Sequence, residues 1–116
     1  MKALHDLSHI PKRIVNIVQQ FATDSKRLLQ DNVIGEYLFG SYATNTQTTL
    51  SDIDILILVN SHTTATRQQL SGLASDYSLE HDVYISPVLK DLHVWNENKA
   101  HNTLFYQEIM TYGVAL

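Results

Sequence analysis

The apolar run from Ile55 to Val59, with the sequence ILILV, constrains the fold of this chain more than any other segment. A strand that faces solvent on one side alternates apolar and polar residues, but this run is apolar at every position. It is therefore predicted to be a central strand of a sheet that is covered on both faces. Another strand is expected at Val33–Phe39 (VIGEYLF), and residues 40–54 connect the two.

This connecting segment combines two features of a site for a metal-bound nucleotide. Asp52 and Asp54 lie at the start of the second strand, about 6–7 Å apart along it, and side-chain alternation puts both carboxylates on one face. Such a pair can hold one or two divalent cations. Gly40 and Ser41 follow the first strand and offer a tight turn, backbone N–H groups and a small hydroxyl, which together suit a phosphate group.

The order Gly-Ser, ten further residues, Asp-x-Asp resembles the motif of the polymerase-β-like nucleotidyltransferases. The short chain is similar to the minimal nucleotidyltransferases (MNT) of HEPN–MNT toxin–antitoxin pairs, and the resemblance covers Pro11 to Leu116. It implies a palm-like core, ATP as the donor substrate and a pair of Mg²⁺ ions as cofactor. Asp52 and Asp54 would be metal ligands and catalytic residues, and Gly40 and Ser41 would bind the nucleotide.

A third strand is expected at Glu80–Ile85, ending before Pro87. The resemblance implies a third acidic residue on this strand, which would bind metal and act in catalysis. Asp82 matches that position, and Glu80, on the same face of the strand, is the alternative.

Apolar residues recur with a helical period in three other segments. The first helix is expected to run from about Ile10 towards Asn32, with Ser8 as its N-cap and Pro11 in its first turn. The other two helices are expected around Leu70–Tyr77, after a cap within Ser61–Thr64, and from about Asn102 or Thr103 to Gly113.

Helices and strands alternate along the chain with short connections. This order predicts a compact α/β (α+β) fold in which flanking helices pack on a mixed sheet. A chain of 116 residues is expected to form one domain, 1–116, and residues 1–9, which show no clear period, are predicted to be a loose N-terminal arm.

Composition excludes several classes of function. The net charge of −4 and the absence of a basic stripe disfavour direct binding of bulk nucleic acid. The chain has no cysteine, which excludes disulfides and thiolate metal sites, and its longest apolar run is too short to span a bilayer. A cytoplasmic protein without membrane association is expected.

These features describe the donor side of a nucleotidyl transfer, so a second macromolecule is expected to bring the acceptor. The resemblance implies that AMP passes from ATP to a tyrosine hydroxyl of a partner HEPN ribonuclease toxin, with this chain as the antitoxin in a hetero-oligomer. The segment Tyr42–Gln47, however, carries no charge to bind a triphosphate. A binding module that neutralises its partner by occlusion is therefore the alternative, and transfer to a small hydroxylated molecule is a third hypothesis.

Overall fold

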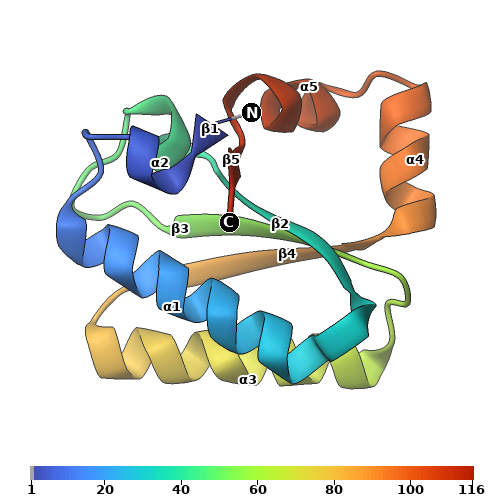
Figure 1. Ribbon diagram of the computed structural model, residues 1–116, viewed down its shortest axis with the longest axis horizontal. Helices are drawn as coiled ribbons and strands as arrows, with labels where there is room; N and C mark the ends of the chain where they lie inside the picture. Colours follow the sequence, from blue (N-terminus) through green and yellow to red (C-terminus); the bar gives the residue numbers. More distant parts are fainter. Residues whose placement is uncertain (1) are drawn as a thin grey trace.

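The computed structural model describes residues 2–116 (Figure 1). Its five strands form one mixed sheet in the order β1-β5-β2-β3-β4. The strand β2 runs antiparallel to β3 and to β5, whereas β3 and β4 are parallel, as are β1 and β5. The predicted mixed sheet with flanking helices is confirmed. The strands are β1 (Lys2–Ala3), β2 (Val33–Phe39), β3 (Ile53–Val59), β4 (Ile85–Asp91) and β5 (Val114–Ala115).

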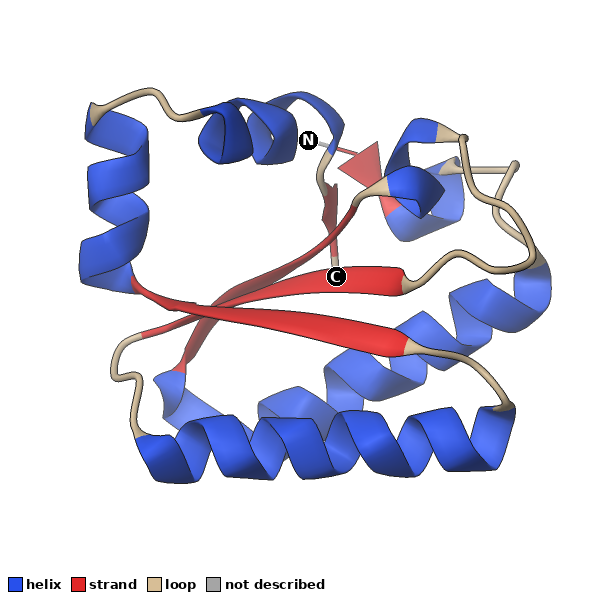
Figure 2. Cartoon of the chain, turned by 180° about the vertical axis from the view of Figure 1, so that it is seen from behind, coloured by secondary structure: helices blue, strands red, loops and turns tan. Residues whose placement is uncertain are grey.

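Two pairs of helices cover the two faces of the sheet (Figures 1 and 2). The long helices α1 and α3 lie side by side on one face, and α4 and α5 lie on the other side. A single turn, α2, directly follows β2. The helices are α1 (Lys12–Leu29), α2 (Ser41–Thr44), α3 (Thr64–His81), α4 (Leu92–Ala100) and α5 (Leu104–Tyr112), with short 3-10 turns at Leu4–Asp6 and Gln30–Asn32.

The strand β3 is the centre of the molecule, as its sequence predicts. Ile55 and Ile57 point into the larger core, together with residues of α1 and α3. Leu56 and Leu58 point the other way and pack with Ile109 of α5. All five side chains of the run Ile55–Val59 are buried, so its continuous apolar sequence reflects burial on both faces of the sheet.

The expectation of a loose arm at residues 1–9 is wrong for the described part of that segment. Lys2–Ala3 pairs with Val114–Ala115 at the edge of the sheet, and Leu4 and Leu7 are buried in the larger core. Two strand residues and two buried leucines are too few to produce a recognisable spacing of apolar residues in the sequence. The predicted cap is also wrong, because α1 begins at Lys12 with Pro11 as its N-cap and without a capping side chain.

The predicted third strand is wrong in its position. The helix α3 continues to His81, whose ring packs against that of Tyr77 one turn earlier with the centroids 5.4 Å apart. The strand then begins at Ile85 and passes through Pro87. Proline is tolerated there because β4 is an edge strand, where a backbone N–H is not needed on the open side. Within residues 2–116, no helix is long and apolar enough to cross a membrane.

Candidate active site

Gly40 brings the end of β2 against the carboxylate of Asp54. The residue has φ 74°, a conformation that favours glycine, and a Cβ atom at this position would overlap Oδ2 of Asp54. The antiparallel register, which pairs Phe39 with Asp54, explains this approach. The phosphate-binding turn and the metal-binding aspartate that the sequence predicts are therefore direct neighbours.

Ser41 begins α2 directly beside this contact. The amides of Ala43 and Thr44 donate to the Gly40 carbonyl at 3.1 and 3.2 Å, and the side chains of Tyr42 and Ala43 are buried, so the turn is anchored to the core. The half-buried Ser41 is left at the surface. Its hydroxyl and the first two N–H groups of the turn, those of Ser41 and Tyr42, are suitable donors to a phosphate group.

Asp52 and Asp54 form the carboxylate pair that the Asp-x-Asp spacing predicts. Asp52 is exposed and Asp54 is half-buried at the start of β3. Burial raises the pKa of Asp54, and the negative charges of Asp52 and Glu108 raise it further. The site thus carries an excess of negative charge that a divalent cation would neutralise.

The donor set fits Mg²⁺. No three His, Asp or Glu side chains within residues 2–116 are placed to hold a cation together. Mg²⁺, however, is commonly held by one or two carboxylates together with the phosphates of its substrate. Asp52 and Asp54 would supply those carboxylates, and Ser41 directly follows Gly40, the residue that lies against Asp54.

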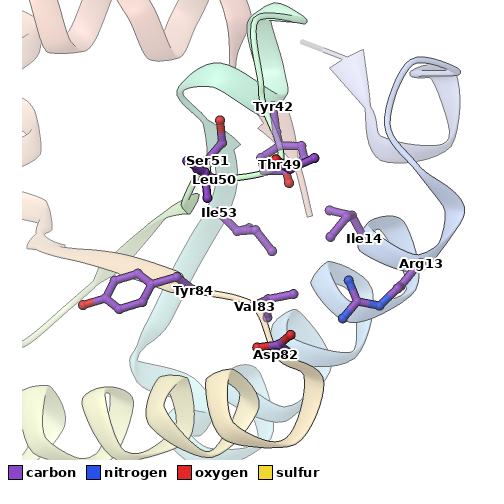
Figure 3. A pocket seen from close by; sticks show the side chains of 10 residues that line it. All are labelled: Arg13, Ile14, Tyr42, Thr49, Leu50, Ser51, Ile53, Asp82, Val83 and Tyr84. Atoms are coloured by element: carbon purple, nitrogen blue, oxygen red, sulfur yellow. The ribbon is translucent and has the colours of Figure 1, made fainter.

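Asp82 does not lie where the sequence-based hypothesis put it. It follows α3 in a left-handed conformation (φ 51°), three residues before β4 begins, and so does not share a strand face with Asp54. Instead it lies beside Arg13 in a cavity of about 320 Å³ that neither Asp52 nor Asp54 lines (Figure 3). Glu80, the alternative, lies within α3 and is exposed. The structure therefore brings Asp52 and Asp54 together and leaves Asp82 and Glu80 apart from them.

The carboxylate that accompanies the pair is Glu108 of α5. On β4, the residue in register with Asp54 is Ser86, which has no charge. Phe105 packs edge-to-face on Phe39 with the ring centroids 5.4 Å apart, and this contact places α5 beside the register partner of Asp54. The sequence predicts a helix here with an apolar face, but nothing in it indicates that the helix returns over the sheet to the Asp-x-Asp segment.

A positively charged side chain from another part of the sequence lies next to the uncharged segment Tyr42–Gln47. Arg13 of α1 lines the cavity beside Tyr42 and Thr49, and its guanidinium donates a hydrogen bond to the His81 carbonyl. One positive charge therefore lies next to the connecting segment, although the segment itself has none.

Known proteins resemble this chain in sequence and in fold. The sequence profile of the family described as "Nucleotidyltransferase domain" matches residues 18–116, and the chain belongs to this family. The Methanocaldococcus jannaschii protein named "Putative protein adenylyltransferase MJ0141" is 36% identical over 102 residues, which cover 87% of this chain and 96% of that protein. A second protein of that organism, named "Putative protein adenylyltransferase MJ1305", is 28% identical over 81 residues, which cover 67% of this chain and 55% of the relative.

Solved structures of toxin–antitoxin complexes have the same fold. One, a toxin–antitoxin with AMP-PNP, matches 94% of this chain and 72% of its own chain with a TM-score of 0.53 and 25% identity. Another, a mutant of the MntA–HpeT toxin–antitoxin, matches 86% of this chain and 69% of its own with the same TM-score and identity. The chain is thus a minimal nucleotidyltransferase domain that is similar in structure to these complexes.

Replacing Gly40 by Ala tests the close contact with Asp54. The positive φ and the overlap should cost about 1–3 kcal/mol of folding free energy, and displacement of the turn should weaken ATP binding. Urea denaturation and titration with a fluorescent ATP analogue measure the two effects. Gly72→Ala is the matched control, because a Cβ at Gly72 meets nothing within 4 Å. Equal behaviour of the two variants would contradict the contact.

Replacing Glu108 by Gln tests its link to the carboxylate pair. Loss of the nearby negative charge should lower the pKa of Asp54 towards its ordinary value, a change that carboxyl ¹³C NMR of the metal-free protein can follow. Glu97→Gln in α4 is the control. It removes the same charge at a residue that pairs with His93 at 3.2 Å and is not among the groups that shift the pKa of Asp54. Transfer activity should fall by about tenfold in Glu108→Gln alone, as for residues that support a metal site. An unchanged titration of Asp54 would show that Glu108 is not coupled to the site.

Proposed function

We propose that this protein transfers AMP from ATP to a tyrosine hydroxyl of a partner HEPN ribonuclease toxin and so acts as the antitoxin of the pair. The observation that carries the proposal is the contact between the Gly40 backbone and the Asp54 carboxylate, which joins a phosphate cradle to a cation site. The relative named as a protein adenylyltransferase supports the reaction, and the similarity to toxin–antitoxin complexes supports the partner.

The residues divide the work of an in-line displacement at the α-phosphorus. Ser41 and the amides at the start of α2 would hold the outer phosphates of ATP, and Asp52 and Asp54 would be the ligands for a pair of Mg²⁺ ions. When bound, Mg²⁺ neutralises charge on the phosphates and lowers the pKa of a hydroxyl. The acceptor oxygen forms a bond to the α-phosphorus as the bond to the β,γ-pyrophosphate breaks. The hydroxyl proton passes to solvent or to a carboxylate of the site. Glu108 takes the place beside the pair that the resemblance assigned to Asp82.

Mass spectrometry of the partner is the test of this proposal. The purified protein is mixed with ATP, Mg²⁺ and a purified HEPN-class ribonuclease toxin. The expected result is an added mass of one or more AMP groups on a tyrosine of the ribonuclease, lost in Asp52→Asn and Asp54→Asn. Its ribonuclease activity should fall in parallel with the modification.

The uncharged segment Tyr42–Gln47 favours a second candidate, neutralisation by occlusion without turnover. Tight binding and full neutralisation of the ribonuclease without any added mass would establish this candidate and exclude adenylyl transfer. Neutralisation that survives Asp54→Asn would point the same way.

A further inference from the structure

Tyr84 lines two neighbouring cavities. The first, of about 320 Å³, lies between the start of α1, residues 49–53 and the segment before β4. The second, of about 480 Å³, lies between α3 and β4. We name the combined surface the α3–β4 groove and define it by Leu50, Ser71, Ser75, Leu79, Asp82 and Tyr84.

Three large apolar side chains of this groove are exposed to solvent. Leu50 is 90% exposed, Leu79 is 86% exposed and Tyr84 is 65% exposed. They come from a loop, a helix and the segment before a strand, yet they line adjoining cavities. Single exposed apolar residues are ordinary, but a group of them around a concave surface is typical of a binding site for another protein.

The edge of β4 within the groove is closed to an added strand. The outward N–H of Ile85 donates to the Ser78 hydroxyl at 3.4 Å, and Pro87 has no N–H to offer. Backbone pairing with an incoming strand would therefore lack two of its donors. A partner in this groove has to be held by its side chains.

One end of the groove adjoins the candidate active site. Ser51 lines the groove and directly precedes Asp52, and the N–H of Ile53 donates to the Tyr84 carbonyl at 2.8 Å. In Figure 3, Tyr84 extends away from Arg13 and Asp82, which face each other at the other side of the cavity. A chain that fills the groove would thus lie next to the carboxylate pair.

The charges around the groove define the chemistry of its occupant. Asp82 lies in it, and Asp76 and Glu80 are exposed on the last turns of the neighbouring α3. These three carboxylates would attract basic groups. Arg13 donates to the His81 carbonyl and only partly offsets this charge.

We propose that the α3–β4 groove docks the acceptor protein through a segment with apolar side chains flanked by basic residues. The proposal rests on the proposed function, because it assumes that the acceptor is a protein. It assigns Leu50, Leu79 and Tyr84 to substrate recognition rather than to chemistry. The nucleotide would remain on the other side of the Asp-x-Asp segment, at Ser41.

The test uses the full chain and the HEPN-class ribonuclease that it modifies or binds in the experiment above. Leu79→Ser and Tyr84→Ser should each weaken binding of the ribonuclease, measured by calorimetry without ATP, by about tenfold or more. The KM for the ribonuclease in AMP transfer should rise by a similar factor, with kcat and ATP affinity unchanged. Both side chains are exposed, so the variants should fold normally. The control is Ile34→Ser, at the opposite end of β2 from Gly40.

Separate outcomes decide the two proposals. Unchanged ribonuclease affinity in both groove variants, or an equal loss in Ile34→Ser, would overturn docking in the groove even if AMP transfer occurs. Groove-dependent binding without any AMP transfer would overturn the proposed reaction and leave the docking surface standing. Retained affinity in the groove variants together with hydrogen-exchange protection along the β4 edge would replace side-chain docking by strand addition.

Discussion

Replacing Asp54 by Asn should reduce the rate of AMP transfer by about 100- to 1,000-fold. Asparagine keeps the shape of the side chain but supplies only a neutral oxygen, which binds Mg²⁺ more weakly than a carboxylate does. The negative charge of the nucleotide phosphates is then no longer neutralised. Stability should move in the opposite direction. Because the raised pKa of Asp54 means that its charge is less favourable in the folded chain than in the unfolded one, removing the charge should maintain or increase the free energy of unfolding at neutral pH.

The measurement combines steady-state kinetics at saturating Mg²⁺ with urea denaturation at pH 7. Asp31→Asn, at an exposed position in the 3-10 turn before β2, is the control and should change neither quantity. Loss of activity accompanied by loss of stability in Asp54→Asn would mean that Asp54 supports the fold rather than the reaction. Full activity in Asp54→Asn would show that Asp54 is not a Mg²⁺ ligand needed for AMP transfer.

Replacing Glu36 by Gln should stabilise the protein at high pH and leave it unchanged at low pH. Glu36 is only 2% exposed in the middle of β2; its Oε2 accepts a hydrogen bond from the Ser25 hydroxyl at 2.7 Å, and its Oε1 has no partner. Burial raises the pKa of this carboxyl from 4.5 to about 7, although Ser25 and Lys26 act to lower it.

The sign of the pH dependence follows from the raised pKa. The folded state holds the proton of Glu36 more tightly than the unfolded state, so the native protein is most stable below pH 4.5 with respect to this group. Stability is lost as the pH rises from 4.5 through about 7. A shift of this size corresponds to about 3 kcal/mol above pH 7. Glutamine cannot ionise, and Glu36→Gln should recover that amount.

Urea denaturation between pH 4 and pH 9 checks this expectation. The difference in unfolding free energy between Glu36→Gln and the unmodified chain should be near zero at pH 4 and should grow up to about pH 7. Asp31→Asn, at an exposed position in the turn before β2, should show no such trend. A difference that is constant with pH would indicate altered packing rather than loss of an ionisable group.

Much of the framework follows from local sequence patterns. The predicted strand Val33–Phe39 is confirmed with the same bounds, and the apolar run Ile55–Val59 lies within the predicted central strand. The short turn after Gly40 and the cap before α3, formed by Thr63, are also confirmed. These elements depend on the period of apolar residues and on the preferences of Gly, Ser and Thr, which act over a few residues.

The position of the third strand could not be read in the same way. Asp82-Val83-Tyr84-Ile85 alternates like a strand, but the contact of His81 with Tyr77 extends the helix to that point, and a left-handed residue then ends it. Pro87 indicates the end of a strand in a central position and is compatible with a strand at an edge. Only the strand order of the folded sheet tells which case applies.

The sequence by itself determined the central strand, the Gly-Ser turn and the paired aspartates, because each depends on residues close together in the chain. The tertiary structure alone decided which other groups surround them. Glu108 rather than Asp82 accompanies Asp54, because the packing of Phe105 on Phe39 brings α5 back over the sheet. Likewise, the packing of α1 places Arg13 in one cavity with Tyr42, about thirty positions away in the sequence, and no local pattern encodes this proximity.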